Sequence, residues 1–237
     1  MKTLPKIFTL TVVAAFLFAG SAIAVPTTLY DINGIDGTQK YTDTGYEHVR
    51  LIDTDGNNDD STAFLFLEST IFASDNTLGI YSFSEDNGIF TVGDTLEIFE
   101  GDDSPLKSAT LDFNFMDGTV TNRSSGATAN IGAVFGFYLT TPENGGMTYY
   151  SHSSLNQDGF DHLMLFDTRD NTVGDLLGSD VILAWEDLYG GGEQDFNDMV
   201  VGIGDVVVPT PEPATMLLLG SGLIGLAALR KKRYFRQ

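Results

Sequence analysis

The chain has 237 residues, with 33 acidic and 12 basic side chains, so its formal net charge at pH 7 is −21. It contains no cysteine, which excludes disulfides, cysteine-ligated zinc, iron–sulfur clusters and cysteine nucleophiles. The acidity argues against a nucleic-acid partner, because a polyanion is repelled and no basic stripe is present to release counterions.

Residues 1–24 have the order of a secretory signal peptide. Lys2 and Lys6 give a positive start, and 7–18 is an apolar run. Ala22 and Ala24 then place small residues where a signal peptidase cuts. We therefore expect a signal helix that is removed before Val25. An uncleaved membrane anchor is the alternative, and the short apolar run disfavours it.

The middle of the chain, between Val25 and Pro209, holds no helical apolar period. Short runs rich in Val, Ile, Thr, Tyr and Phe recur there, separated by Gly, Asn and Asp. This spacing predicts an all-β fold, an antiparallel β-sandwich or jelly roll. The strands are expected at 46–52, 63–69, 78–84, 95–100, 109–116, 133–140, 147–151, 162–166, 181–186 and 199–203.

Two further features concern the arrangement of these strands. Val181, Leu183 and Trp185 alternate with the equally apolar Ile182 and Ala184, which predicts a strand buried on both faces. The Gly- and Ser-rich stretch 122–130 is the best internal break. It divides the middle into an N-terminal β-rich part, 25–130, and a C-terminal β-rich part, 131–207. The stretch is either a long loop or the seam between two halves.

The last segment, 208–237, contains three parts in order: Pro211-Glu212-Pro213, an apolar stretch at 214–229, and a basic cluster at 230–233. As a helix, the apolar stretch would span roughly 24 Å, against a hydrocarbon core of about 30 Å. We expect a marginal transmembrane helix whose basic end stays in the cytoplasm.

This tail resembles the PEP-CTERM sorting signal, with Pro211, Glu212 and Pro213 as the motif. The resemblance implies export through the inner membrane of a Gram-negative bacterium and processing by an exosortase. It also implies a place at the cell surface or in the extracellular matrix, after transient anchorage in the membrane by the C-terminal helix. Such proteins accompany exopolysaccharide production and biofilm formation.

Removing both ends makes the chain more acidic. Residues 25–211 keep 5 basic and 32 acidic side chains, so their net charge is 5 − 32 = −27 over 187 residues. Such self-repulsion destabilises a compact state unless cations screen or bind it. Calcium is the cation expected outside the cell.

The first acidic cluster follows the strand expected at 46–52. Its oxygen-bearing side chains alternate along the chain, as in a tight loop around a hard cation, although the spacing is not that of an EF-hand. An acidic turn that is merely solvated is the alternative. This weaker candidate site consists of Asp53, Asp55, Asn57 and Asp59.

The second acidic cluster begins where the strand at 181–186 ends. Three glycines at 190–192 allow the loop to fold back, so that carboxylates from its two sides meet while Phe196 anchors it in the core. Carboxylates gathered so closely repel one another unless a cation lies among them. The stronger candidate calcium site consists of Glu186, Asp187, Asp195, Asn197 and Asp198.

The third cluster lies at 150–162 and offers further oxygen ligands from Asn156, Asp158 and Asp161. His152 and His162 raise the question of zinc, which the oxygen-rich setting disfavours. We expect His162 to hydrogen-bond to a neighbouring carboxylate instead.

The second and third clusters resemble the signature of the domain of unknown function 4114 family. The stretch from Ser151 to His162 resembles its Ser-x-x-Leu-Asn-x-Asp-Gly-x-Asp-His pattern, with one more residue between Ser151 and Leu155. The stretch from Trp185 to Asp198 matches its Trp-Glu-Asp-Leu-x-Gly-Gly-Gly-x-x-Asp-Phe-Asn-Asp pattern. The resemblance covers roughly 133–203 and implies a β-rich extracellular domain, with calcium binding as a plausible property.

The sequence favours a non-catalytic protein. No nucleophile-elbow serine and no nucleotide-binding glycine loop are present, and so many acids make carboxylate pairs unavoidable. We expect a calcium-stabilised surface or matrix protein. Signal peptidase and exosortase would process it during export, and it would then associate with acidic exopolysaccharide. A lectin-like carbohydrate-binding module is one alternative, and it requires exposed aromatic rings near the calcium. A glycoside hydrolase is the other.

Overall fold

The computed structural model describes residues 46–52, 58–70, 72–103, 105–170 and 177–209. It confirms the all-β prediction, with thirteen strands in two antiparallel sheets. In this part of the chain, the only helices are the 3₁₀ turns Glu143–Gly145, Ser153–Leu155 and Thr168–Asp170. None of the described helices is long and apolar enough to cross a membrane. The expected signal helix and C-terminal helix lie outside the described residues.

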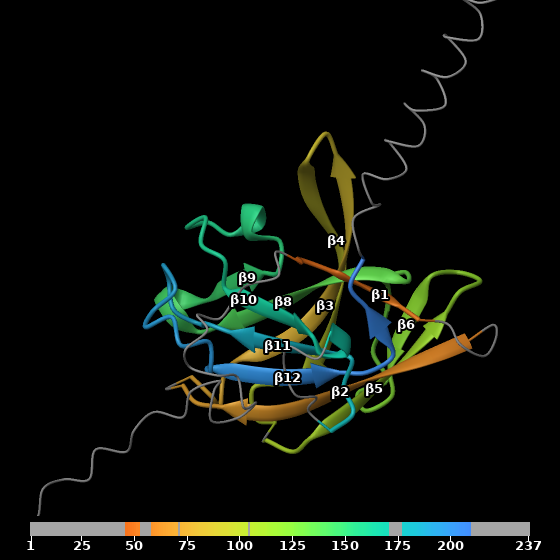
Figure 1. Ribbon diagram of the computed structural model, residues 1–237, viewed down its shortest axis with the longest axis horizontal. Coiled ribbons are helices and arrows are strands. Elements are labelled where there is room, and N and C mark those ends of the chain that lie inside the picture. Colours follow the sequence, from red (N-terminus) through yellow and green to blue (C-terminus); the bar gives the residue numbers. More distant parts are fainter. Residues whose placement is uncertain (1–45, 53–57, 71, 104, 171–176, 210–237) are drawn as a thin grey trace, which may run out of the picture.

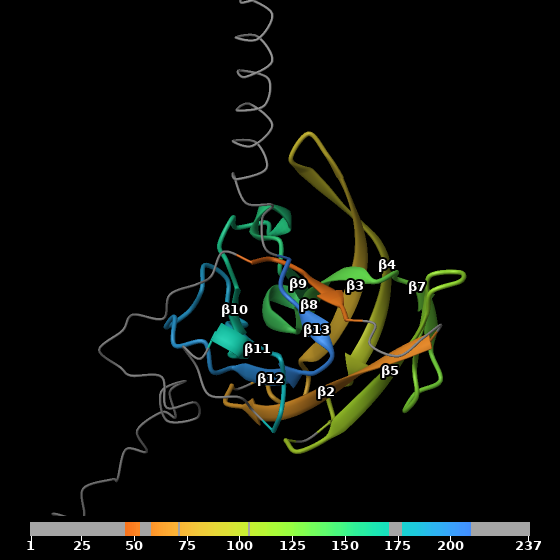
Figure 2. The same ribbon diagram turned by 45° about the vertical axis from the view of Figure 1, so that its right-hand side comes forward.

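The first sheet has six strands in the order β13-β1-β8-β3-β4, and β9 pairs with β8 beside β1. Its β3–β4 hairpin continues beyond the rest of the sheet and projects from the molecule (Figures 1 and 2). The bounds are Val49–Leu51 for β1, Thr77–Asp86 for β3, Ile89–Phe99 for β4, Val134–Thr141 for β8, Met147–Tyr150 for β9 and Val206–Val207 for β13.

The second sheet has seven strands in the order β10-β11-β12-β2-β5-β6-β7. Its bounds are Asn58–Glu68 for β2, Ser108–Asn114 for β5, Thr119–Asn122 for β6, Thr128–Asn130 for β7, Leu163–Asp167 for β10, Val181–Trp185 for β11 and Met199–Ile203 for β12. Strands from 25–130 and from 131–207 pair directly in both sheets, as β3 with β8 and β2 with β12. The two β-rich parts therefore share one pair of sheets.

The main core lies between the two sheets and follows the alternation of the strands. Leu111 and Phe113 of β5, like Phe135 and Phe137 of β8, are buried in it. A second apolar cluster, which includes Ile182, Ala184 and Val200, lies on the other face of the seven-stranded sheet. Strand β11 is thus buried on both faces, as its unbroken apolar sequence predicted.

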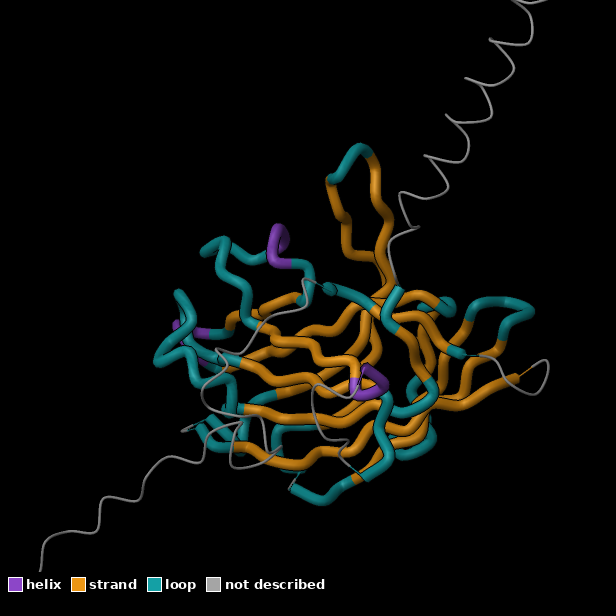
Figure 3. The backbone as a smooth tube through the Cα atoms, viewed as in Figure 1, coloured by secondary structure: helices purple, strands orange, loops and turns teal. Residues whose placement is uncertain are grey.

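All ten predicted strands are present; β12 has the predicted bounds, and the other nine have shifted ends. Strand β2 begins at Asn58, inside the first acidic cluster, because it pairs with β5 over that stretch. Strands β6, β7 and β13 were not predicted. The stretch 122–130, expected as a break, instead contains the turn and second strand of the β6–β7 hairpin. Figure 3 shows loops collected at one end of the sandwich, next to the ends of β10, β11 and β12.

Candidate functional site

The loop from β11 to β12 folds back as predicted. Gly190, Gly191 and Gly192 all have positive φ, and a Cβ on either of the last two would meet a close neighbour. A Cβ on Gly191 would lie 2.1 Å from the Phe160 ring, and one on Gly192 would lie 2.9 Å from Glu186 Oε2. Side chains therefore cannot fit at these two positions without a rearrangement. The return of the loop is completed by the Asp198 backbone N–H, which donates to the Trp185 carbonyl over 3.2 Å.

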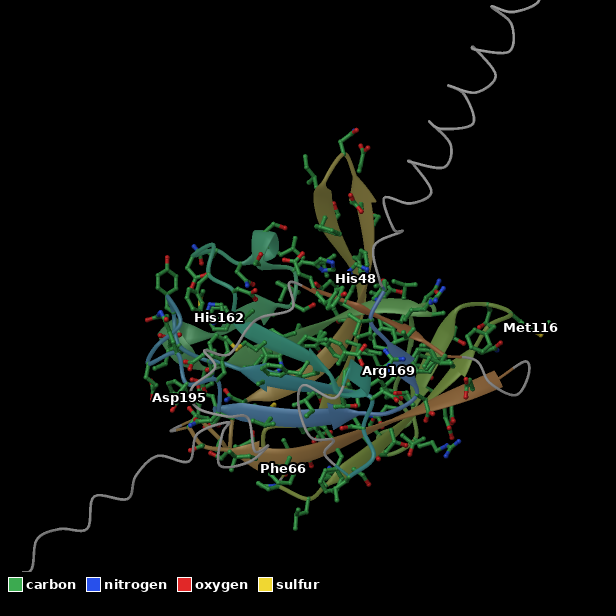
Figure 4. The ribbon with its side chains drawn as sticks, in the orientation of Figure 1. His48, Phe66, Met116, His162, Arg169 and Asp195 are labelled. Atoms are coloured by element: carbon green, nitrogen blue, oxygen red, sulfur yellow. The ribbon has the colours of Figure 1, made fainter. Side chains whose placement is uncertain are left out.

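This loop brings the five residues of the stronger candidate site to one end of the seven-stranded sheet, where Figure 4 labels Asp195. Their contacts form two groups. The Glu186 carboxylate accepts the Phe196 backbone N–H over 2.7 Å and contacts the carboxyl of Asp195. Asp195 in turn accepts from the Asn197 amide over 2.7 Å.

The second group contains Asp187 and Asp198. The Asp198 carboxylate accepts the Asp187 backbone N–H over 2.9 Å. The Asp187 carboxylate accepts from Thr70 over 2.6 Å and from Asn76 over 2.8 Å. Thr70 and Asn76 lie between β2 and β3, more than a hundred residues away in sequence, so no local pattern could have predicted them.

The cluster carries buried negative charge without matching donors. Glu186 and Asp187 are fully buried, yet Glu186 Oε2 and Asp187 Oδ1 have no hydrogen-bond partner, and neither has the buried Asp195 Oδ1. No lysine or arginine of the described residues forms an ion pair with this cluster. The ion pairs of these residues are Lys107 with Asp103, Arg123 with Asp60 and Asp112, and Arg169 with Asp167. A buried carboxylate oxygen without a partner costs free energy of folding.

The protonation equilibria reflect this environment. Burial raises the pKa of Glu186 to about 7; the Phe196 hydrogen bond opposes the rise, and the charge of Asp195 adds to it. Burial likewise raises the pKa of Asp198, with further contributions from the charges of Asp187 and Glu186. Among the described residues, no group of three or more His, Asp or Glu side chains is disposed to hold a metal ion. The cluster is therefore not a preassembled metal cage.

The oxygen-bearing side chains of the third cluster form hydrogen bonds with the backbone of the loops. The Asn156 side chain accepts the Tyr150 N–H and donates to the carbonyls of Tyr150 and Phe160. Asp158 accepts from the backbone N–H groups of Phe160 and Gly190, over 3.0 and 2.7 Å. Asp161 accepts the Leu163 N–H over 3.3 Å. Through Asp158, the 151–162 stretch is tied to the glycine loop.

His162 is fully buried and binds at both ring nitrogens, to Glu186 O over 2.8 Å and to Asp158 over 3.0 Å. The predicted bond from His162 to a neighbouring carboxylate is thus confirmed. The ring stacks on Tyr149 with 3.5 Å between centroids, and the Tyr149 hydroxyl donates to Glu143. Burial raises the pKa of Asp158, but the bonds from Gly190, Phe160 and His162 outweigh it and hold that pKa below its usual range.

His152 lies in a different group, at the base of the projecting hairpin, where Figure 4 labels His48. Its ring is fully buried among Phe83, Phe90 and His48, and its Nδ1 lies 2.5 Å from the Tyr81 hydroxyl. Neither histidine of the third cluster therefore presents a ring nitrogen to solvent for zinc binding or acid–base chemistry. Sequence reasoning did not identify Tyr81, His48, Glu143 or Tyr149 as neighbours of these histidines.

The weaker candidate site falls mostly outside the described residues, which do not include Asp53, Asp55 or Asn57. Asp59 is the second residue of β2 and pairs with Phe113 of β5. One of its oxygens accepts the Asp60 N–H over 2.9 Å, and the other is buried without a partner. The sorting motif Pro211, Glu212 and Pro213 also lies outside them.

The described part of the chain also has a cavity of about 330 Å³ beside the middle of β2 and the end of β12. It is lined by Thr62, Phe64, Gly202, Gly204, Asp205 and residues 177–180. Burial and the charge of Asp180 raise the pKa of Asp205 at this cavity.

Comparison with known families gives two matches. Residues 130–204 match the domain of unknown function DUF4114, and residues 209–233 match the PEP-CTERM protein-sorting motif. The second match marks a protein that is exported, processed by an exosortase, and destined for the cell surface or extracellular space of Gram-negative bacteria. Neither match is to a catalytic family. No curated protein and no solved structure matches the chain.

The DUF4114 match covers strands β8 to β12 and both loop clusters. Strands β2 and β3, which pair with β12 and β8, lie before it. In this chain, the matched segment therefore depends on earlier strands to complete both sheets.

Proposed function

We propose that the chain is a non-catalytic surface or matrix protein whose acidic loop cluster takes up calcium after export. The observation that carries the proposal is the set of three buried carboxylate oxygens without a partner, on Glu186, Asp187 and Asp195. Without a cation these oxygens stay buried and unpaired. In a millimolar calcium medium, a cation can neutralise them.

Calcium suits these residues better than a transition metal, because the donors are carboxylate and amide oxygens. Since no three carboxylates converge as they stand, the cation would bind one of the two groups, Glu186 with Asp195 or Asp187 with Asp198. Amide, carbonyl or water oxygens would complete its shell. Asn156, Asp158 and Asp161 would then support the site by holding the glycine loop, and the weaker site of Asp53, Asp55, Asn57 and Asp59 would take a second ion.

The proposed export and processing of the protein depend on its N-terminal and C-terminal segments. A signal helix at 1–24 would direct export and be cut by signal peptidase, and the helix at 214–229 would hold the chain in the membrane until exosortase acts. The released or anchored sandwich, with its excess of acid, would then associate through bridging calcium with acidic exopolysaccharide in a biofilm.

The test is thermal unfolding of the purified full-length chain in EDTA and in 10 mM calcium. Extracellular modules bind calcium with dissociation constants of about 0.1–1 mM, so one site would add about 1.5–3 kcal/mol of stability. Magnesium at the same concentration should add much less. An unfolding midpoint that does not respond to calcium contradicts the proposal.

Two double variants locate the site. Asp195→Ala with Asp198→Ala should remove the response to calcium. Asp86→Ala with Asp94→Ala removes the same number of carboxylates from exposed positions on the β3–β4 hairpin and should leave the response unchanged. A calcium response that survives the first pair moves the site elsewhere in the chain.

A lectin-like function is the second candidate, and one observation favours it. Tyr189 lies in the acidic loop with 51% of its surface exposed, while its backbone N–H is held by Glu143 over 2.7 Å. An exposed ring on a fixed backbone beside a calcium site can stack on a sugar. Tyr189→Ala should then abolish sugar-competable binding to polysaccharide and leave the calcium-dependent midpoint unchanged. Equal binding by both proteins would rule out this role for Tyr189.

A further inference from the structure

The described segment before β1, residues 46–48, is held to the turn after β9 by two side chains. Glu47 accepts the backbone N–H and the hydroxyl of Ser153, over 2.9 and 2.8 Å. His48 stacks on His152, with 5.3 Å between ring centroids and 24° between ring planes. These contacts join the segment to the turn after β9.

The two imidazoles lie in a group that we call the histidine clamp: His48, His152, Tyr81, Phe83 and Phe90. Phe83 of β3 and Phe90 of β4 contact the His152 ring at centroid distances of 4.5 and 4.0 Å. Phe83 also contacts His48, at 5.0 Å. The clamp thus connects the β3–β4 hairpin, the turn after β9 and the segment before β1.

Two nitrogens of the clamp are buried without a hydrogen-bond partner, His48 Nδ1 and His152 Nε2. The Tyr81 oxygen accepts the His152 backbone N–H over 3.3 Å, and its hydroxyl lies 2.5 Å from His152 Nδ1. A neutral His152 keeps the contact between Nδ1 and the Tyr81 hydroxyl and leaves only an uncharged Nε2 without a partner. A protonated His152 would carry an N–H at Nε2 with no acceptor, next to a second imidazole in apolar surroundings.

The charged and titratable groups around the clamp do not compensate for this. Glu47 and Glu85 attract a proton on His48, but burial outweighs them and lowers the pKa of His48. Burial and the neighbouring His48 lower the pKa of His152 to about 4. Tyr81 and Tyr150 are the other titratable groups nearby, and burial raises the pKa of Tyr81.

Strand β1 connects the clamp to the C-terminal end of the fold. It begins one residue after His48 and pairs with β13, through Arg50 with Val207 and Leu51 with Val206. Val208 is buried, and the match to the sorting motif begins at the next residue, 209. We propose that the histidine clamp is an acid-sensitive lock on β1, and that its protonation releases β1 and β13 next to the sorting motif.

Hydrogen–deuterium exchange of the full-length chain tests this proposal at about pH 7.5 and about pH 5, after correction for the intrinsic effect of pH. Protection of Val49–Leu51 and Val206–Val207 should fall roughly tenfold or more at the lower pH, while β11 and β12 change by less than about twofold. Equal protection at both pH values overturns the lock, as does a loss of equal size in β11 and β12.

The variant His152→Phe keeps a ring in the clamp but removes the fully buried one of its two imidazoles, so the difference between the two pH values should become much smaller. Arg50→Gln is the control, because it changes the charge of exposed Arg50 on β1 without touching the clamp, and it should keep the difference. A pH effect of undiminished size in His152→Phe overturns the assignment.

A measurement on the unaltered chain tests the proposal even if the His152→Phe variant fails to fold. The chain has 3 histidines, so an NMR titration of the imidazole signals can follow His48, His152 and His162 separately. His152 should stay neutral until β1 loses protection, and its titration should coincide with that loss. Titration of His152 at or above the ordinary pKa, with β1 still protected, overturns the proposal.

Discussion

The ring of Tyr81 lies directly over Gly136, its cross-strand partner on β8. A Cβ at Gly136 would lie 2.5 Å from the Tyr81 ring, so the ring occupies the space that any other residue would need. The relationship is repeated two pairs along with the strands exchanged, where the Tyr138 ring of β8 covers Gly79 of β3. These paired contacts fix where the Tyr81 hydroxyl meets His152.

Gly136→Ala should destabilise the protein by about 2–3 kcal/mol, because the new methyl group must displace the Tyr81 ring and its hydrogen bond to His152. Urea unfolding measures the loss. Gly204→Ala is the control, since a Cβ there meets only one atom within 4 Å, the Thr62 carbonyl oxygen at 3.8 Å, and it should change stability by less than about 1 kcal/mol. Equal effects of the two variants would contradict this account of the Gly136 contact.

Asp158→Asn should cost about 2–4 kcal/mol, because it removes the charge that faces buried His162 and weakens the hold on Gly190. Chemical denaturation at neutral pH measures this loss of stability. Asp167→Asn provides the comparison, since its pair with Arg169 is partly exposed and should contribute less than about 1 kcal/mol. A loss at Asp158 no larger than the loss at Asp167 would show that the buried pair does not stabilise the loops.

Glu68→Gln should stabilise the protein at high pH. Burial raises the pKa of Glu68 to about 8, and the charges of Asp103 and Asp187 add to the rise. The folded state therefore holds this proton more tightly than the unfolded state, so the contribution of Glu68 to stability declines between about pH 4.5 and pH 8.

The gain from Glu68→Gln should be about 1–3 kcal/mol at pH 8 and near zero at pH 4, as measured by unfolding in EDTA at both values. Glu100→Gln, at an exposed position, should have little effect at either pH. If Glu68→Gln destabilises at pH 8, the carboxylate is stabilising in its charged form and the prediction is wrong.

Asn122→Ala should cost about 2–3 kcal/mol, because this buried side chain links the two sheets. Its amide donates to the carbonyls of Glu97 and Ile98 on β4, and its oxygen accepts the Ser124 N–H. The alanine leaves these groups without partners. Thermal unfolding measures the change, and Asn130→Ala at an exposed position of β7 should differ from the parent by less than about 0.5 kcal/mol. A similar midpoint for both variants would refute the link.

By itself, the sequence determined the all-β class, ten of the thirteen described strands and the return of the glycine loop. Each depends on local information: alternation along one strand, or the conformational freedom of consecutive glycines such as Gly191 and Gly192. The bond from His162 to Asp158 was also predictable, because the two residues are four positions apart. Strands β6, β7 and β13 were missed because they are short, and the first two are mostly polar.

Only the tertiary structure decided which groups meet across the fold. Tyr81 reaches His152 over 71 positions in sequence, and Asn76 reaches Asp187 over 111. Such contacts follow from the order and register of strands in the sheets, which alternation within single strands does not specify. The same order leaves Glu186 and Asp187 buried with unpartnered oxygens, since donors in the sequence act only where the paired strands bring them within hydrogen-bond distance.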